Sequence, residues 1–319
     1  MRAFQVTEYG KSPQISEVEV PQPGPGELRL KVAACGLNFA DLLMVTGEYQ
    51  ERPPLPFALG MEMSGTVEAL GEGVSGPAVG TRVGAFGGRG GLADYAVVPA
   101  DRCVPLADTM SFDEAAAFPV AYGTSHVALS HRARLAKGET LLVLGAAGGV
   151  GLTAVEIGKL MGARVIACAR GAAKLEVAKA AGADHLIDSE TDDIRQAVKD
   201  LGGCDVVYDP VGGPHFMAAL RATRPEGRLI TIGFASGEVP QIPSNLLLVK
   251  NLTAIGFYWG GYMGFRPKVV TDSLAQLYRW HEEGRLHPHI SHRLALEQAA
   301  EGLELLRSRR STGKVVITI

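Results

Sequence analysis

The middle of the chain alternates short apolar runs with stretches in which apolar residues recur at helical spacing. Residues 141–144 are four consecutive apolar residues, as in a strand that is buried on both faces of a parallel sheet. A glycine-rich turn and a helical stretch up to Gly162 follow. Strands are expected at 141–144, 164–169, 185–188, 205–209, 228–233 and 252–256, with helices near 172–181, 191–200 and 213–222. This pattern predicts an α/β fold with a doubly wound parallel sheet.

Residues 1 to about 117 show a different pattern, with short strand-like runs separated by turns rich in glycine and proline. Strands are expected at 1–6, 15–20, 28–34, 65–70, 82–86 and 92–99. Helical patterning begins near Ser111, and Glu114 three residues later completes a capping-box sequence. This part of the chain is therefore predicted to form a compact, barrel-like fold.

The end of the chain has predicted elements but no sheet of its own. Helices are expected near 271–283 and 296–308, and a last strand at 314–319. We therefore expect these residues to return to the first domain. The predicted domains are residues 1–117 together with 260–319, and an inserted domain at 118–259.

Composition narrows the class of protein. The 319 residues carry a net charge of −3, which gives no electrostatic footprint for nucleic acid or an anionic membrane. No apolar run approaches the about 18 residues of a spanning helix, and the N-terminus lacks the pattern of a secretory signal. The four cysteines are scattered, without a C-x-x-C pair. A cytoplasmic enzyme without nucleic-acid or membrane partners is the expectation.

The turn at 145–151 lies between a buried strand and a helix, which is the setting of a dinucleotide-binding turn. One glycine permits a tight turn, one lets a pyrophosphate approach the backbone, and one lets the helix pack close to the strand. If Gly148 and Gly151 fill the second and third positions, Ala146 takes the first. The helix N-terminus then offers N–H groups to the phosphates. The alternative is a glycine-rich turn that binds nothing.

The end of the next strand bears on the choice of nucleotide. An NAD site usually has Asp or Glu here for the ribose 2′-OH, whereas an NADP site has Arg or Lys for the 2′-phosphate. This chain has Arg170 and Lys174, with no carboxylate before Glu176. The sequence therefore favours NADPH over NADH, and ordinary surface charges on a loop are the alternative.

Short motifs along almost the whole chain resemble those of one family. They are the segments 36–41, 47–49, 60–67, 80–83, 147–151, 209–213 and 312–316. In this order and spacing they resemble the zinc-free quinone oxidoreductases, the ζ-crystallin-like family of the medium-chain dehydrogenase/reductase superfamily. The resemblance implies a GroES-like β-rich catalytic domain with an inserted Rossmann domain, and hydride transfer from NADPH to a quinone. It also implies a homodimer in which the cofactor-domain sheets join edge to edge.

Two positions within this resemblance argue against a catalytic zinc ion. Zinc-dependent relatives have Cys where this chain has Asn38, and His where it has Met61. An amide and a thioether do not replace a thiolate and an imidazole around Zn²⁺. We therefore expect no metal, and reduction of an activated acceptor rather than alcohol oxidation.

The resemblance also implies the site residues. Asn38, Asp41 and Tyr49 are the implied catalytic residues beside the nicotinamide. Tyr49 is expected to donate a hydrogen bond to substrate oxygen, with an ordinary half-buried tyrosine as the alternative, and Asp41 to orient Asn38 or a backbone amide. The implied cofactor contacts are Asn38, Thr124, Ala147, Gly148, Gly149, Val150, Arg170, Lys174, Ser189, Gly233, Phe234, Ala235 and Phe257. Many relatives have Tyr where this chain has Ser189, so Arg170 gains importance for NADPH.

Two other functions stay open. The same fold and cofactor could reduce the C=C bond of an enal, an enone or an enoyl thioester, for which Arg266 and Lys268 are the nearby cations. A protein that binds the nucleotide without turnover is the third hypothesis. The aromatic loop at 256–265 is expected to line the substrate cleft, and the histidines at 287–292 are expected to be surface residues rather than metal ligands.

Overall fold

The middle of the chain forms one six-stranded parallel sheet in the computed structural model, which describes residues 1–319. The strands are β9 (Thr140–Leu144), β10 (Arg164–Ala169), β11 (His185–Asp188), β12 (Cys204–Asp209), β13 (Thr223–Thr231) and β14 (Thr253–Gly256). Their order is β11-β10-β9-β12-β13-β14, and every neighbouring pair is parallel. This is the strand order of the Rossmann fold, so the predicted doubly wound sheet is confirmed.

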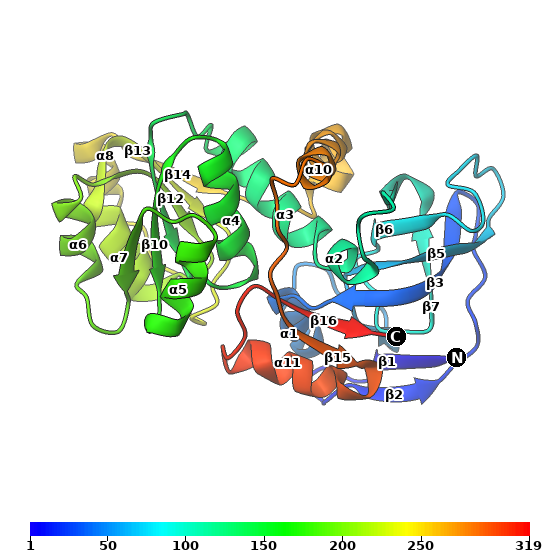
Figure 1. The fold of residues 1–319 in the computed structure, drawn as a ribbon. Coiled ribbons are helices and arrows are strands. Elements are labelled where there is room, and N and C mark those ends of the chain that lie inside the picture. The colour runs from blue at the N-terminus through cyan, green and yellow to red at the C-terminus, as the bar shows by residue number, and fades with distance from the viewer. The chain divides into compact units, whose positions relative to one another are not determined.

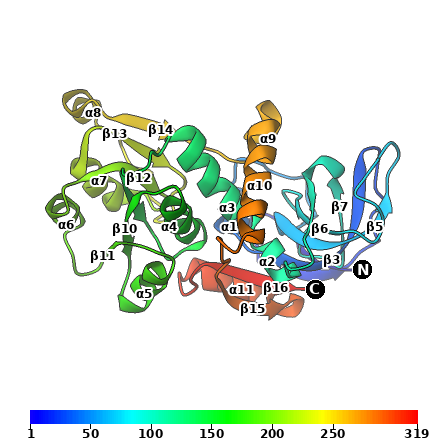
Figure 2. The ribbon, with the colours of Figure 1, turned by 45° about the horizontal axis from the view of Figure 1, so that its top comes forward.

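Helices cover both faces of this sheet, as Figures 1 and 2 show. They are α4 (Gly149–Leu160), α5 (Ala172–Ala180), α6 (Ile194–Asp200), α7 (Gly213–Ala222) and α8 (Ser244–Lys250). Alternate residues of β9 face opposite ways: Leu142 packs in one core with α6 and α7. Leu141 faces α4, where Gly158 leaves room for its side chain. An almost wholly apolar β9 is what a sheet covered on both faces requires.

The chain divides into two compact units, Met1–Val120 with Pro288–Ile319 and Ala121–His287. The second unit also contains most of α3 (Pro119–His126), the π-helical segment η2 (Val127–Arg132), α9 (Tyr262–Phe265) and α10 (Pro267–Glu282). The prediction that the chain returns to the first domain at 260 therefore differs from the structure. His126 explains why, because its Nδ1 lies 2.7 Å from Ser273 Oγ and its ring packs edge-on against Trp280, both on α10.

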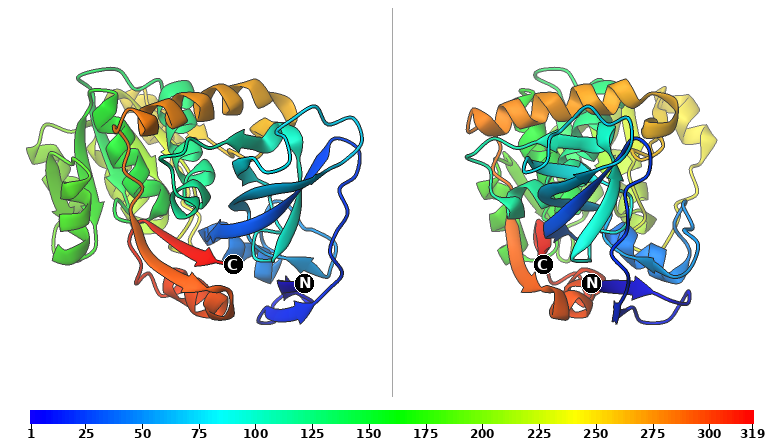
Figure 3. Two further views of the ribbon diagram at one scale, coloured as in Figure 1. Left: turned by 45° about the vertical axis from the view of Figure 1, so that its right-hand side comes forward. Right: turned by 90° about the vertical axis from the view of Figure 1, so that its right-hand side faces the viewer.

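The first unit is built from short strands that pair antiparallel, except for the parallel pair of its two C-terminal strands, and Figure 3 shows that it holds both chain ends. A three-stranded sheet has the order β2 (Gln14–Glu17), β1 (Arg2–Val6), β4 (Phe57–Ala58). A seven-stranded sheet comprises β15 (Ile290–Ala295), β16 (Lys314–Thr318), β3 (Glu27–Gly36), β5 (Glu62–Leu70), β6 (Arg82–Phe86) and β8 (Cys103–Pro105) in this order, with β7 (Tyr95–Pro99) paired to β3. Strand β16 joins the sheet against β3, so the last residues of the chain do complete the first unit.

Three further helices and two short 3₁₀ segments complete this unit. Helix α1 spans Phe39–Thr46, α2 spans Phe112–Ala116 and α11 spans Ala299–Arg307, with the 3₁₀ segments η1 (Ala100–Arg102) and η3 (Leu296–Gln298). Helix α2 begins with the predicted capping box, in which Glu114 N–H donates to Ser111 Oγ and Ser111 N–H donates to Glu114 Oε2. None of the helices combines the length and the apolar character that crossing a bilayer requires.

Candidate functional site

The glycine-rich turn connects β9 to α4 and depends on the absence of side chains. Gly145 adopts a left-handed φ of 59°, and its carbonyl accepts a hydrogen bond from Gly148 N–H at 3.0 Å. A Cβ on Gly151 would lie 2.2 Å from Gly145 O, so only glycine allows the helix to start this close to the turn. The sequence assigned the first motif position to Ala146, whereas the left-handed residue of this turn is Gly145.

This arrangement exposes a helix N-terminus. Helix α4 begins at Gly149 with Gly148 as its N-cap, and Gly148 is exposed to solvent. The N–H groups of the first helical turn have no intrahelical partners, and the positive end of the helix dipole lies there. Because no acidic side chain occupies the first turn, the site can accept an anionic phosphate.

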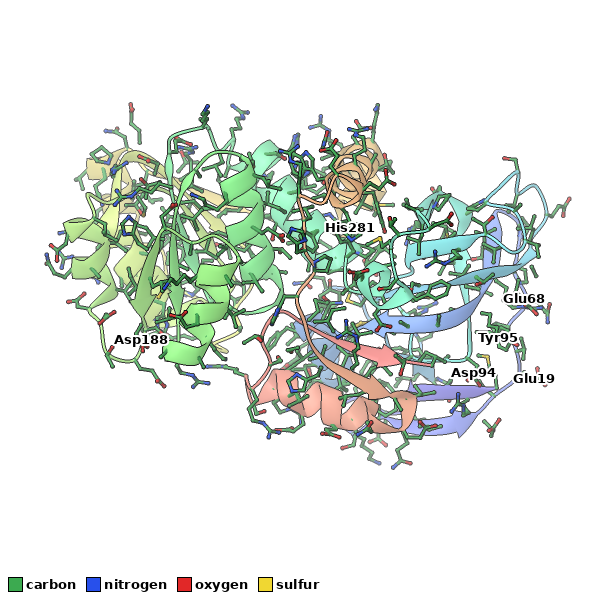
Figure 4. The ribbon with its side chains drawn as sticks, in the orientation of Figure 1. Glu19, Glu68, Asp94, Tyr95, Asp188 and His281 are labelled. Carbon is green, nitrogen blue, oxygen red and sulfur yellow. The ribbon has the colours of Figure 1, made fainter.

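The predicted 2′-phosphate residue Arg170 lies at the end of β10 and is exposed. Its Nε lies 3.7 Å from Glu190 Oε1, in an ion pair that solvent reaches on both sides. Asp188, labelled in Figure 4, accepts hydrogen bonds at 3.0 Å from the N–H groups of Gly171 and Glu190, which lower the pKa of its carboxyl group. These two carboxylates were not predicted because one ends the next strand, β11, and the other lies just beyond it.

The other predicted cofactor residues of the second unit follow the carboxyl ends of its strands, which meet at one edge of a parallel sheet. Ser189 N–H donates to Ala169 O, and Ala235 N–H donates to Pro210 O, at 3.0 Å in both cases. The turn after β12 lies against the glycine turn, because a Cβ on Gly145 would be 2.9 Å from Val211 Cγ2. The structure places along this edge Ala147, Gly148, Gly149, Val150, Arg170, Lys174, Ser189, Gly233, Phe234, Ala235 and Phe257.

Thr124 lies on a helix that packs against the residues following the same turn. It lies on α3 and is buried. The neighbouring Ser125 Oγ donates to Val150 O at 2.9 Å, so α3 packs against the start of α4. Ser125 Oγ also lies within 3 Å of the hydroxyl oxygens of Thr153 and Tyr208, which fixes this contact from three elements.

A second polar cluster lies in the interior of the first unit. Lys314 Nζ donates three hydrogen bonds of 2.7 Å, to Leu37 O, Asn38 Oδ1 and Glu62 Oε1. Glu62 also accepts from Asn38 Nδ2 at 2.9 Å and from Val120 N–H at 2.8 Å. Lys314 and Glu62 are almost completely buried, with side chains 5% and 0% exposed. The cluster is therefore a buried ion pair whose charges are fully hydrogen-bonded.

Asp41 is the second carboxylate of this region. It is buried on α1 and accepts from Asn38 N–H at 2.7 Å and from Gly60 N–H at 3.3 Å. Burial raises the pKa of Asp41 to about 7, although the N–H of Asn38, the charge of Lys314 and the N–H of Gly60 act in the opposite direction. The structure thus joins Asn38 and Asp41 through a backbone-to-side-chain hydrogen bond.

Tyr49 lies three residues beyond Thr46, the last residue of α1, and is partly buried. Its backbone N–H donates to Leu43 O at 3.2 Å, in the bonds that close the helix. Lys314 is the member of the polar cluster that was not predicted from the sequence. The available signal was a lysine at the start of an otherwise apolar strand, because a buried ammonium needs a partner.

The two groups of residues can do different things. The turn in the second unit presents backbone N–H groups and a cation to a phosphorylated ligand. The cluster in the first unit fixes the Asn38 amide through both of its polar atoms. Across the structure, no group of three or more His, Cys, Asp or Glu side chains is arranged to hold a metal ion.

Comparison with known proteins gives matches over both units. Residues 24–108 match the family model described as "Alcohol dehydrogenase GroES-like domain", and residues 149–276 match "Zinc-binding dehydrogenase". The chain is 40% identical over 314 residues to "Quinone oxidoreductase-like protein 2" of Bos taurus, covering 97% of this chain and 90% of that protein. It is 38% identical over 323 residues to the homologue from Nematostella vectensis, covering 99% and 88%.

Solved structures are similar over the full length. The quinone oxidoreductase of Thermus thermophilus, described with its NADPH complex, superposes with a TM-score of 0.89 at 33% identity and full coverage of both chains. The Escherichia coli quinone oxidoreductase complexed with NADPH gives a TM-score of 0.93 at 27% identity, again with full coverage of both chains.

Proposed function

Since the chain belongs to the quinone oxidoreductase family of the medium-chain dehydrogenase/reductase superfamily, we propose that it catalyses the reduction of a quinone by NADPH. When bound, NADPH supplies the hydride from C4 of its nicotinamide. The observation that carries the proposal is the glycine turn with Arg170 at the end of the next strand. Gly151 lets α4 start close against the turn, because a Cβ there would lie 2.2 Å from Gly145 O, and the N–H groups at this helix start suit the phosphates of a dinucleotide.

Arg170 is proposed to select NADPH over NADH. Its ion pair with Glu190 is long and exposed, and such pairs contribute little stability. A 2′-phosphate carries more charge than one carboxylate and can accept two parallel hydrogen bonds from a guanidinium group. Arg170 would therefore exchange Glu190 for the phosphate at little cost.

Asn38, Asp41 and Tyr49 are proposed to form the polar wall of the substrate site. Both polar atoms of the Asn38 side chain are committed within the protein, to Lys314 and Glu62. Both carboxylate oxygens of Asp41 accept backbone N–H groups, which suits an orienting residue better than a proton donor. This leaves the Tyr49 hydroxyl as the proposed hydrogen-bond donor to the quinone oxygen.

The reaction is proposed to be independent of zinc. The Lys314 ammonium lies 2.7 Å from Asn38 Oδ1 and 2.7 Å from Glu62 Oε1, so a cation of the protein already neutralises this carboxylate. A divalent ion next to these atoms would meet the repulsion of that ammonium. Met61, beside Glu62 in the sequence, is buried and offers only a thioether.

A homodimer and a cytoplasmic location complete the proposal. Strand β14 is the edge of the six-stranded sheet, and its residues Thr253 and Ala254 are exposed. The preceding helix α8 exposes Leu248 and Val249, which are 76% and 66% accessible. An open edge beside apolar side chains favours pairing with a second copy. All four cysteines are free and buried, which suits a reducing compartment.

Oxidation of NADPH and of NADH by 1,4-benzoquinone and 9,10-phenanthrenequinone tests the function, with and without EDTA. We expect turnover with NADPH that EDTA does not change. Arg170→Ala should raise KM for NADPH about tenfold and leave NADH kinetics unchanged. Lys179→Ala is the matched control, because Lys179 makes a similarly exposed 3.9 Å ion pair with Glu176 on α5. Turnover only with a conjugated enal would refute the quinone proposal and leave the cofactor assignment intact.

A further inference from the structure

A cavity of about 550 Å³ lies at the end of the six-stranded sheet where the strands begin, opposite to the end that carries the glycine turn. Its lining comes from α6, the turn at 202–203, the end of α7, the start of β13, and α8. Figures 1 and 2 show these three helices together at one end of the second unit. Strands β12 and β13 begin beside the cavity, whereas the predicted nucleotide site lies where the strands end. The cavity is therefore separate from that site.

The charged side chains that line this cavity are all cationic: Arg195, Lys199, Arg221, Arg224 and Lys250. Two of them have internal partners. Arg224 pairs with Asp205 at 2.7 Å, and Lys250 donates to the carbonyls of Leu220 and Arg221. Arg195, Lys199 and Arg221 have no ion-pair partner in the structure. In a chain of net charge −3, this is a local excess of positive charge.

Compensation of helix dipoles explains only part of this excess. Lys199, Arg221 and Lys250 lie in the last turns of α6, α7 and α8, where cations are stabilising. Arg195, however, is the second residue of α6, where a cation opposes the dipole. It also lies four residues before Lys199, a spacing at which like charges repel on a helix.

The cations face one another across the cavity. Burial, together with the charges of Lys199 and Arg195, lowers the pKa of the Lys250 ammonium, although the thiol of Cys204 acts in the opposite direction. Lys199 and Arg195 lie on α6 and Lys250 on α8, so side chains of two helices direct like charges toward the same space. An anion in that space would remove this repulsion.

The shape of the cavity favours a ligand larger than a single anion. Gly202 and Gly203 form part of its wall with left-handed φ values of 92° and 81°. A Cβ on Gly203 would lie 2.9 Å from Arg224 Cγ, so a side chain there would displace this arginine. Leu220 and Leu246 add apolar surface. The volume of about 550 Å³ falls within the range of about 300–1,000 Å³ typical of small-molecule sites.

We propose that this cavity binds a small molecule bearing linked phosphates, of the class of nucleoside di- and triphosphates, at a second anion site of the cofactor unit. The linked phosphates would contact Arg195, Lys199 and Arg221, which lack partners. The ring system would lie on Leu220 and Leu246. Inorganic triphosphate shares the phosphate chemistry but not the ring, so it separates the two contributions.

Calorimetric titration of the full chain tests the proposal, with NADPH saturating so that the dinucleotide site is filled. ATP, inorganic triphosphate and orthophosphate are titrated at about 0.15 M ionic strength, where long-range attraction is screened. We expect ATP and triphosphate to bind and orthophosphate to bind much more weakly. If the protein binds ATP more tightly than triphosphate, the apolar wall contributes to binding. If the two affinities are equal, the phosphate chain alone accounts for binding.

Charge reversal locates the site. Lys199→Glu with Arg221→Glu should weaken ATP binding by about tenfold or more, since both are exposed and lose charge-assisted contacts. Lys179→Glu with Lys268→Glu makes the same change in net charge on exposed lysines outside the cavity, and should leave ATP binding unchanged. NADPH affinity should be equal in all three proteins. The proposal is overturned if ATP fails to bind beside NADPH, if ATP displaces NADPH, or if both double variants weaken binding equally.

Discussion

The glycine turn of the second unit and the polar cluster of the first unit are built in opposite ways. The turn is contiguous in the chain, from Gly145 to Gly151, and its recognition groups are backbone N–H groups. The cluster joins Asn38, Glu62 and Lys314, whose positions in the chain are up to 276 residues apart, and it consists of side chains. The turn depends on glycines, which have no side chain, whereas the cluster depends on side chains that form hydrogen bonds and an ion pair with one another.

The difference decides how each site can fail. A side chain added to the turn moves the backbone itself, so the loss appears in ligand binding. A side chain removed from the cluster leaves a buried charge or an unpaired polar atom, so the loss appears first in the stability of the fold. A variant of the turn that mainly lost stability, or a variant of the cluster that mainly lost ligand binding, would contradict this distinction.

The largest effect is expected for Lys314→Met. The substitution preserves most of the side-chain volume but leaves the Glu62 carboxylate buried without its cation, and Asn38 Oδ1 without its donor. Breaking a buried pair in this way costs about 3–5 kcal/mol of unfolding free energy. Hydrogen exchange of peptides from the first unit, resolved by mass spectrometry, measures this loss.

Two controls accompany Lys314→Met. Both tryptophans, Trp259 and Trp280, lie in the second unit, so the urea transition followed by their fluorescence should change much less. Lys268→Met removes an exposed ion pair with Asp272 and should cost less than about 0.5 kcal/mol. Adding Glu62→Gln to Lys314→Met should recover part of the loss, since it removes the uncompensated charge. No recovery would mean that the pair is not what stabilises the cluster.

The second-largest effect is expected for a substitution in the glycine turn. Gly151→Ala places a Cβ at 2.2 Å from Gly145 O, so the start of α4 must move away from the turn. We expect the affinity for NADPH to fall by about 10- to 100-fold, with a smaller change in stability. Fluorescence titration with NADPH measures it. Gly264→Ala serves as the control, because a Cβ there meets nothing within 4 Å. Unchanged NADPH affinity in Gly151→Ala would remove the turn from the proposed nucleotide site.

The same contrast explains what could be predicted from the sequence. The Rossmann sheet and its glycine turn were accessible because strand, turn and helix follow one another, and the pattern of each is local. The position of α10 in the second unit could not be predicted in this way. Its buried face, which includes Val270, Leu274 and Leu277, predicts a helix but does not identify the surface against which it packs. The role of Lys314 was missed for a related reason, because its partners belong to β5 and to the residues before α1.

The smallest effect is a difference in pH dependence between the two units. Burial raises the pKa of Asp41 in the first unit to about 7, above that of an unfolded aspartate. The folded state then holds more protons, so the stability of this unit falls as pH rises from about 4 to about 7. Burial lowers the pKa of His126 in the second unit to about 4, so the stability of that unit falls as pH decreases from about 6.5 to about 4.

Measurements on each unit separate the two trends. From about pH 5.5 to about pH 8, hydrogen exchange in the first unit, corrected for its intrinsic pH dependence, should indicate a loss of roughly 1–2 kcal/mol. Asp41→Asn should abolish this slope. Over the same range, tryptophan fluorescence should show the second unit gaining or keeping stability, and His126→Gln should flatten its decline below about pH 6.5. The contrary result would be the same slope in both units, unchanged by Asp41→Asn. In that case Asp41 does not determine how the stability of the first unit depends on pH. Its carboxylate is then stabilised in the ionised form by the N–H groups of Asn38 and Gly60.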